Sequence, residues 1–92
     1  MYTLVWTAYF TRAAGKFIKR HPELKKKLAA ILQALETNPF DGRLHYHQLK
    51  GKLKDIQAVS LTGKYRLTLK IVITDKEVIL LDIGSHDEVY KK

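Results

Sequence analysis

The segment Tyr65-Arg66-Leu67-Thr68-Leu69-Lys70-Ile71-Val72-Ile73-Thr74 decides the fold of this chain. Apolar and polar side chains alternate along it, and successive side chains of a strand point to opposite faces of a sheet. The core-facing set is then Tyr65, Leu67, Leu69, Ile71 and Ile73, and the opposite set is Arg66, Thr68 and Lys70. We therefore expect a strand that buries one face and presents a basic one.

Two further strands are predicted on either side of this segment. Residues 56–61 and 77–83 are rich in Ile, Val and Leu, and the short polar links Thr62-Gly63 and Asp75-Lys76 separate them from it. Links of this length usually connect antiparallel neighbours. The C-terminal half is therefore expected to form three antiparallel strands.

The N-terminal half has a first strand and then helical periodicity. Residues 2–6 are aromatic and β-branched, and Thr7 is a suitable N-cap for the helix that follows. His21-Pro22-Glu23 interrupts the helical pattern, which resumes over residues 24–35 and ends at the turn residues 38–42. The order β-α-α-β-β-β predicts an α+β fold, with a mostly antiparallel four-stranded sheet and a helical hairpin packed on one face.

Composition limits the class of protein. The chain has 92 residues, 46% of them hydrophobic, which is enough for one domain spanning residues 1–92. Seventeen Lys and Arg against nine Asp and Glu give a formal net charge of +8, which favours partners that carry phosphate. The absence of cysteine excludes a disulfide framework and a thiolate zinc site. With no apolar run of membrane-spanning length and no signal-peptide pattern, we expect a cytoplasmic protein.

Basic residues are concentrated between Arg43 and Lys70. This segment contains Arg43, Lys50, Lys52, Lys54, Lys64, Arg66 and Lys70. A solvated face that keeps a small protein soluble explains any one of these lysines. As a group, with Arg66 on a strand, they favour phosphate binding. A second basic cluster is expected on the outer helix faces, where solvation is the simpler explanation: Arg12, Lys16, Lys19, Arg20 and Lys25-Lys26-Lys27.

The four histidines suggest acid–base chemistry more than metal binding. His45 and His47 have no carboxylate or cysteine at ligand spacing, so no metal site is expected. His21 precedes a proline and is most simply a helix-start residue. His86 follows an apolar strand, within the closing residues 84–92, and is either a structural hydrogen-bonding group or an acid–base group.

Cleavage of RNA is a reaction that histidine suits. With an unperturbed pKa of about 6.5, an imidazole can accept or donate a proton near neutral pH. A base removes the ribose 2′-OH proton, the oxygen attacks the adjacent phosphorus, and an acid protonates the departing 5′-oxygen. An arginine or lysine stabilises the added charge, and no metal is required. Tyr90 is suited to stacking on a base, or equally to anchoring the chain end.

Four features together resemble toxins of the RelE/ParE superfamily. They are the β-α-α-β-β-β order, the loop His47-Gln48-Leu49-Lys50-Gly51, the strand Tyr65-Arg66-Leu67 and the ending Gly84-Ser85-His86-Asp87-Glu88-Val89-Tyr90. Over essentially its whole length the chain is similar to RelE/StbE-type toxins of bacterial type II toxin–antitoxin modules. The resemblance implies a RelE-like fold and an mRNA interferase, a ribosome-dependent endoribonuclease that needs no cofactor. A cognate antitoxin would hold it inactive.

The resemblance also implies roles for individual residues. His86 matches the general acid, His47 matches a loop histidine that assists as candidate base, and Arg66 matches an arginine that stabilises the phosphate. Together with the basic segment, this gives the expected RNA-binding residues Arg43, Lys50, Lys52, Lys54, Lys64 and Tyr90.

The chain departs from the family pattern in two places. Many active relatives have an arginine shortly before the closing histidine, where this chain has Leu81-Asp82-Ile83, so we expect Arg66 and Lys64 to carry more of the transition-state charge. Ser60 occupies a position where some relatives have a second histidine. Two alternatives stay open. One is a non-catalytic ParE-like toxin that inhibits DNA gyrase, and the other is a basic RNA-binding module whose histidines have no chemical role.

Overall fold

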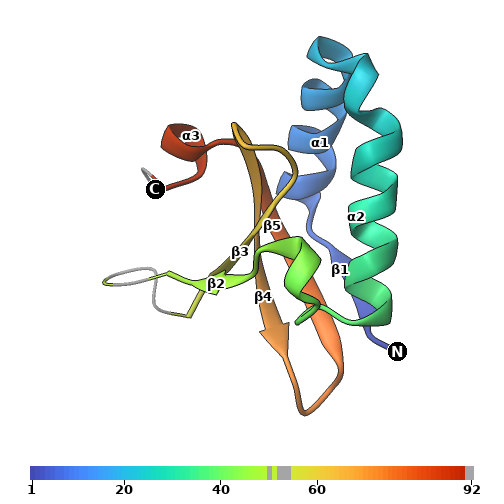
Figure 1. Ribbon diagram of the computed structural model, residues 1–92, viewed down its shortest axis with the longest axis vertical. Coiled ribbons are helices and arrows are strands. Elements are labelled where there is room, and N and C mark those ends of the chain that lie inside the picture. The colour runs from blue at the N-terminus through green and yellow to red at the C-terminus, as the bar shows by residue number, and fades with distance from the viewer. Residues whose placement is uncertain (50, 52–54, 91–92) are drawn as a thin grey trace.

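The computed structural model describes residues 1–49, 51 and 55–90, without the side chains of His47 and Tyr90 (Figure 1). The elements are β1 (Thr3–Trp6), α1 (Ala8–Arg20), the 3-10 helix η1 (Pro22–Leu24), α2 (Lys25–Thr37), the 3-10 helix η2 (Gly42–Leu44), β2 (His47–Gln48), β3 (Gln57–Ser60), β4 (Tyr65–Val72), β5 (Glu77–Ser85) and α3 (His86–Tyr90). The predicted order β-α-α-β-β-β is confirmed, and the short elements β2 and α3 are added to it.

All five strands form one sheet in the order β1-β5-β4-β3-β2. β1 runs parallel to β5, and the other three pairs are antiparallel. The four longer strands make up the mostly antiparallel sheet that the sequence predicts, while β2 adds two residues at the edge beside β3. Since β1 and β5 are neighbours, the first strand of the chain lies beside the strand that leads into the closing motif.

The helical hairpin packs on one face of the sheet, as predicted (Figure 1). Thr7 caps α1, because its Oγ accepts a hydrogen bond from the backbone N–H of Phe10 at 3.1 Å. The same hydroxyl donates to the carbonyl of Leu80 at 2.7 Å, which joins the start of α1 to β5. Phe10 and Leu35 are fully buried between the helices and the sheet. One core therefore holds the helices and the strands together.

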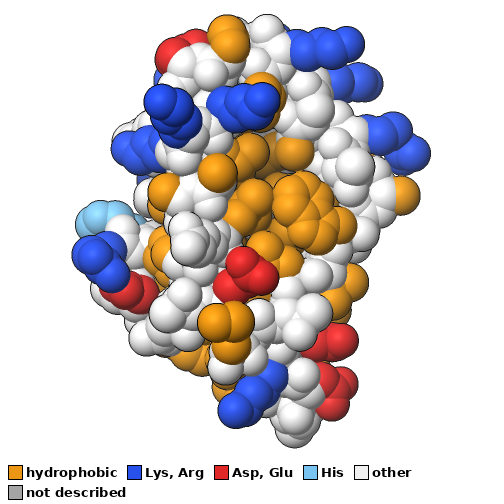
Figure 2. Space-filling view, turned by 90° about the vertical axis from the view of Figure 1, so that its right-hand side faces the viewer, with side chains coloured by type: hydrophobic (Ala, Val, Ile, Leu, Met, Phe, Trp, Pro, Cys, Tyr) orange, Lys and Arg blue, Asp and Glu red, His pale blue; other side chains and the backbone are white. Residues whose placement is uncertain are grey.

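The outer side of the helical layer is partly apolar and partly basic. Figure 2 shows hydrophobic side chains gathered in the middle of this side, with Lys and Arg around the upper part. The second basic cluster predicted from the sequence is exposed at every position, from Arg12 to Lys27. These cations are therefore solvent-exposed as predicted, but Lys16 and Arg20 also line a cavity on the side of α1 that faces β5 and α3.

β4 has the predicted alternation over most of its length. Leu67 and Leu69 are fully buried and belong to the core. The prediction is wrong at Ile73, which is 65% exposed, because β4 ends at Val72 and residues 73–76 form the turn to β5. Lys76 in this turn adopts the left-handed region with a φ of 52°. The hairpin therefore turns two residues earlier than the pattern indicates.

A β-bulge in β5 decides which of its side chains face the helices. Thr68 pairs with Asp82, while the next residue of β4 pairs with Leu80, so Leu81 is the extra residue. A bulge places two residues against one and breaks the strict alternation of faces. Leu80 and Ile83 consequently both reach the core. Asp82, which is only 8% exposed, lies beside Thr68 on the face away from the helices, called the open face below.

Candidate functional site

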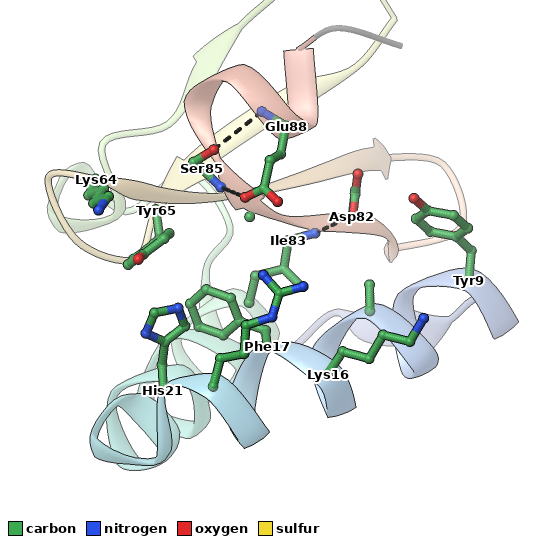
Figure 3. A pocket seen from close by; sticks show the side chains of 13 residues that line it. Tyr9, Lys16, Phe17, His21, Lys64, Tyr65, Asp82, Ile83, Ser85 and Glu88 are labelled. Carbon is green, nitrogen blue, oxygen red and sulfur yellow. Dashed lines mark hydrogen bonds between the residues drawn. The ribbon is translucent and has the colours of Figure 1, made fainter.

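A capping box converts the end of β5 into the start of α3. The backbone N–H of Ser85 donates to Glu88 Oε1 at 2.9 Å, and the backbone N–H of Glu88 donates to Ser85 Oγ at 3.3 Å (Figure 3). This reciprocal pair satisfies two donors that a helix N-terminus otherwise leaves unpaired. His86 is the first residue of α3, and 62% of its side chain is exposed. The capping box therefore presents the imidazole of His86 to solvent at the end of a buried strand.

Glu88 packs closely against the backbone of Gly84. A Cβ at position 84 would lie 3.1 Å from Glu88 Oε1 and 3.3 Å from Glu88 Cβ, which is tighter than most real contacts. Hydrogen bonds from the backbone and side chain of Ser85 lower the pKa of Glu88, so its carboxylate stays charged as the cap acceptor. Gly84, Ser85 and Glu88 thus have architectural roles in the motif.

The two residues that the cap leaves exposed are His86 and Asp87. His86 Nδ1 lies 3.8 Å from Asp87 Oδ1, an ion-pair distance when the imidazole is protonated, and the Asp87 side chain is 85% exposed. Figure 1 shows α3 on the side of the sheet away from α2, and α3 contacts both β4 and β5. The predicted acid therefore lies on the open-face side of the sheet, at the end where β4 begins and β5 ends.

Arg66 belongs to the same end of the sheet as His86. On β4 it pairs with Ser60 of β3 and with Gly84 of β5, two residues before His86. Its Nη1 donates to Ser60 Oγ at 3.0 Å. Its Nε is buried and has no hydrogen-bond partner among the described residues. Ser60 is thus the residue that holds the Arg66 guanidinium.

His47 belongs to a different row of the sheet. Its backbone pairs with Ala58, Ala58 pairs with Thr68, and Thr68 pairs with Asp82. Neighbouring strands are about 4.8 Å apart, so the Cα of His47 is roughly 14 Å from that of Asp82. The structure therefore brings Arg66 and His86 to one end of the sheet and leaves the backbone of His47 across its width.

The remaining predicted RNA-binding residues are divided among three places. Lys50, Lys52 and Lys54 lie outside the described residues, and so does the side chain of Tyr90. Lys64 lies in the connection between β3 and β4, with its Nζ 5.6 Å from the centre of the Tyr65 ring.

Arg43 lies beside η2 and is already paired. Its Nη2 is 2.9 Å from Asp41 Oδ2, and its Nε donates to Asp41 Oδ1 at 3.2 Å. These hydrogen bonds lower the pKa of Asp41 to about 2. The carboxylate is thus charged throughout the neutral range and offsets much of the Arg43 charge.

A cavity of about 540 Å³ lies between α1, the end of β5 and α3 (Figure 3). It gathers Lys16, Arg20 and Lys64, but also the carboxylates of Asp82 and Glu88. The sequence pattern placed Lys16 and Arg20 on a solvated helix face and did not connect them with the closing motif. The mixed charge of this cavity makes it a weaker phosphate site than its three cations suggest.

His21 has a structural role in the wall of the same cavity. Its ring packs against Phe17 and Tyr65, with ring centroids 4.8 Å apart in each case. It also ends α1 and precedes η1. The expectation that His21 is a structural residue at a helix boundary agrees with this position.

The centre of the open face is apolar, which corrects the prediction of a basic face. A groove of about 340 Å³ is lined by Thr7, Tyr9, Leu49, Ile56, Thr68, Leu81, Asp82 and Val89. The bulge contributes Leu81, and α3 contributes Val89, which is only 4% exposed. Arg66 and Lys70 flank Thr68, which is buried. Neither the bulge nor α3 was predicted. Their side chains Leu81 and Val89 make this part of the open face apolar.

Sequence comparison assigns the family. No family model matches the chain. The RelE4 protein of Methanocaldococcus jannaschii is 37% identical over 71 residues, which cover 74% of this chain and 71% of RelE4. The chain belongs to the RelE family of toxins. The predicted RelE-type recognition, made from the loop, strand and closing motifs, is therefore confirmed for this RelE-family toxin.

Solved structures have the same fold over nearly the whole chain. YafQ from Escherichia coli has a TM-score of 0.81 at 18% identity, covering 98% of this chain and 99% of YafQ. A metal-bound toxin from Helicobacter pylori has a TM-score of 0.81 at 27% identity, covering 98% and 100%. A chain of the RelBE2 toxin–antitoxin complex from Mycobacterium tuberculosis has a TM-score of 0.68 at 24% identity, covering 92% and 98%. The predicted RelE-like α+β fold is confirmed, and the RelBE2 structure with this fold is a toxin–antitoxin complex.

Metal ligands do not gather in the described part of this toxin. Among residues 1–49, 51 and 55–90, with the His47 side chain excluded, no three His, Cys, Asp or Glu side chains are grouped to hold a metal ion. Within these same residues, no helix is long and apolar enough to cross a membrane.

Proposed function

We propose that this RelE-family toxin is an mRNA interferase that cleaves mRNA on the ribosome in the cytoplasm, without a metal. The observation that carries the proposal is the presentation of His86. The capping box of Ser85 and Glu88 fixes an exposed imidazole at the first residue of α3, at the same end of the sheet as Arg66. An acid–base group can protonate the leaving oxygen, and a guanidinium can stabilise the charge on the phosphate, so these two groups supply two of the tasks that phosphodiester cleavage requires.

Each group has one task in the proposed reaction. A base, for which His47 is the candidate, removes the proton of the ribose 2′-OH, and the oxygen attacks the adjacent phosphorus. The bond from phosphorus to the 5′-oxygen breaks, and His86 donates a proton to that oxygen. The products are a 2′,3′-cyclic phosphate and a 5′-hydroxyl. Arg66 has five N–H donors and uses one of them, on Nη1, in its hydrogen bond to Ser60. In the proposed reaction its guanidinium stabilises the charge that develops on the phosphate.

The position of His47 fits a base that acts across the substrate from the acid. Its strand β2 is two strands away from β4, which carries Arg66. A ribose and phosphate can occupy this width, which is compatible with an acid on α3 and a base on β2. The apolar groove between them accommodates the faces of bases, while the basic residues contact the backbone.

The physiological partner in this proposal is a small acidic antitoxin. The net charge of +8 favours fast, salt-sensitive association with an acidic protein. The RelBE2 complex supports the proposal, since it joins a toxin of similar fold with its antitoxin. Co-purification with the product of a neighbouring open reading frame, followed by a salt titration, tests it.

One experiment separates this proposal from the two alternatives. Wild-type protein, His86→Ala and the matched control Asp87→Asn are induced in bacteria, and mRNA 5′ ends are mapped. We expect His86→Ala to lower cleavage by about 10²-fold, the effect of losing a positioned acid. Asp87→Asn removes the neighbouring charge without altering the imidazole, so cleavage should stay within about fivefold, the limit for an exposed ion pair. Circular dichroism of both purified variants serves as the control for folding.

The possible outcomes point to different functions. Unchanged cleavage by a folded His86→Ala protein removes His86 from the mechanism. Growth arrest by the wild type without any mRNA cleavage, together with accumulation of cleaved or unreplicated DNA, favours the gyrase-inhibiting ParE-like alternative. RNA binding without cleavage or growth arrest favours the basic RNA-binding module.

A further inference from the structure

A pocket at the β3 edge of the sheet is the most uniformly basic cavity of the described residues. It has a volume of about 490 Å³, lies between α2, the η2 region and the β3–β4 connection, and is called the edge pocket below. Lys27, Arg43, His45 and Arg66 line it together with two hydroxyl residues, Ser60 and Thr62. None of its lining residues is an Asp or a Glu, in contrast to the cavity beside α1.

The basic residues of the edge pocket differ in whether a carboxylate already neutralises them. Arg43 is paired with Asp41, and its side chain is 89% exposed, so it contributes little net charge. Lys27 makes no ion pair with any described residue, and its side chain is exposed in the first turn of α2. Arg66 is half-buried and contacts no carboxylate within the same residues. Lys27 and Arg66 therefore supply the charge that an anion would meet.

Arg66 is incompletely satisfied by the protein. Its Nη1 donates to the neutral hydroxyl of Ser60, while its buried Nε–H finds no acceptor among the described residues. Buried donors are nearly always paired in folded proteins, and an exception calls for an explanation such as a ligand. An anionic oxygen in the edge pocket would give the guanidinium an acceptor of the kind that its fork geometry favours.

We propose that the edge pocket binds a phosphodiester of single-stranded RNA, next to the phosphodiester that is cleaved. This proposal rests on the proposed function, because Arg66 lines the edge pocket and also serves the reacting phosphate. The strand would pass from His86 over Arg66 and leave the sheet at its β3 edge, with Lys27 on the far side of the backbone. Ile31 and Leu61 add apolar surface to the pocket, which a ribose can cover.

Two adjacent lysines provide a matched test. Lys26 and Lys27 are both exposed in the first turn of α2, but only Lys27 lines the edge pocket. Binding of a fully 2′-O-methylated 12-nucleotide RNA, which cannot be cleaved, is measured at several salt concentrations for wild type, Lys27→Ala and Lys26→Ala. We expect Lys27→Ala to bind about two- to fivefold more weakly, as for loss of an exposed ion pair. The slope of log affinity against log salt should fall by about 0.7, the value for one fewer neutralised phosphate on a single strand.

Lys26→Ala should bind the RNA as the wild type does. Equal affinities and slopes for the two lysine variants would overturn the edge pocket, and so would a wild type that does not bind the RNA. A loss confined to inorganic phosphate binding would assign the pocket to the free ion, and a loss confined to antitoxin binding would assign it to a protein interface. Either result would also overturn the proposal.

Cleavage is measured separately, so that the two proposals can fail independently. If His86→Ala retains full cleavage while Lys27→Ala still weakens RNA binding, the mechanism fails and the edge pocket stands. If His86→Ala loses cleavage while Lys27→Ala and Lys26→Ala behave alike, the mechanism stands and the edge pocket fails.

Discussion

The substitution Glu88→Ala should loosen α3 and displace His86 while leaving the rest of the fold intact. It removes the acceptor of the 2.9 Å hydrogen bond from the backbone of Ser85, which is one half of the capping box. Loss of a cap costs about 1 kcal/mol, a factor of about five in the equilibrium between docked and frayed helix. Val89 is 4% exposed and still anchors α3, since burial of such a side chain contributes about 1.5–3 kcal/mol. The helix should therefore fray more often without detaching.

Amide hydrogen exchange measures the fraying of α3, and mRNA cleavage measures the displacement of His86. Protection of the α3 amides should fall about fivefold, and cleavage of mRNA on translating ribosomes should fall by a similar factor. The free energy of unfolding, measured with urea, should change by no more than about 1 kcal/mol. Glu88→Gln is the matched control, because an amide oxygen can take the place of Oε1 and retain most of the effect.

One result would refute this reasoning. If Glu88→Ala kept wild-type protection and cleavage while His86→Ala lost cleavage, His86 would act without help from the capping box. Equal losses for Glu88→Ala and Glu88→Gln would show instead that the carboxylate charge matters more than its geometry.

The same capping interaction sets a pH dependence. The hydrogen bonds with Ser85 lower the pKa of Glu88 from its ordinary value of 4.5. A carboxyl group whose pKa is lower in the folded state contributes stability above the unfolded pKa and loses it as the pH falls through the folded pKa. Protection of α3 should thus be constant between about pH 6 and pH 8, and the contribution of this group should be lost only below about pH 4.5. The Glu88→Gln protein should lack that acid transition.

Two further predictions concern the basic surface. Replacing Lys50, Lys52 and Lys54 together by alanine should weaken RNA or ribosome binding and lower the salt slope by about 0.7 for each phosphate that these lysines neutralise. A wild-type slope in a folded triple variant would show that these lysines serve only solubility. Asp41→Asn should release Arg43 and strengthen RNA binding by about two- to fivefold, as estimated for one exposed charge. Titration of the uncleavable RNA measures this gain, and an unchanged affinity would place Arg43 outside the path of the strand.

The elements of the fold were predictable because their signals are local. The alternation through Leu67 and Leu69 identifies β4. Thr7 marks the start of α1, because its side chain accepts a hydrogen bond from a residue only three positions along the chain. The turn at Ile73 was missed because an isoleucine continues the apolar alternation even where the chain has already turned. Its 65% exposure is decided by where β5 pairs, which the local pattern does not contain.

The candidate site was predictable only in part because it depends on pairing and packing between distant segments. The bulge at Leu81 exists only relative to β4, and it places both Leu81 and Asp82 on a face that the alternation of β4 predicted to be basic. The edge pocket depends on α2 approaching the β3–β4 connection, so Lys27 had no signal of its own. The capping box did have one, since Ser85 followed by Glu88 three residues later is a helix-start pattern.

The closing motif therefore carries two kinds of information that its sequence does not separate. Glu88 packs closely on Gly84, Ser85 and Glu88 cap α3, and Val89 covers the open face, so these residues serve the way in which β5 ends and α3 begins. His86 is exposed in α3, and the two hydrogen bonds of the capping box are made by Ser85 and Glu88, so the capping box itself does not require a histidine at position 86. A resemblance through the whole motif is accordingly strong support for the fold and much weaker support for catalysis. The chemistry depends on His86 and Arg66, and a toxin that kept the cap but replaced this histidine would preserve the fold while losing the proposed acid.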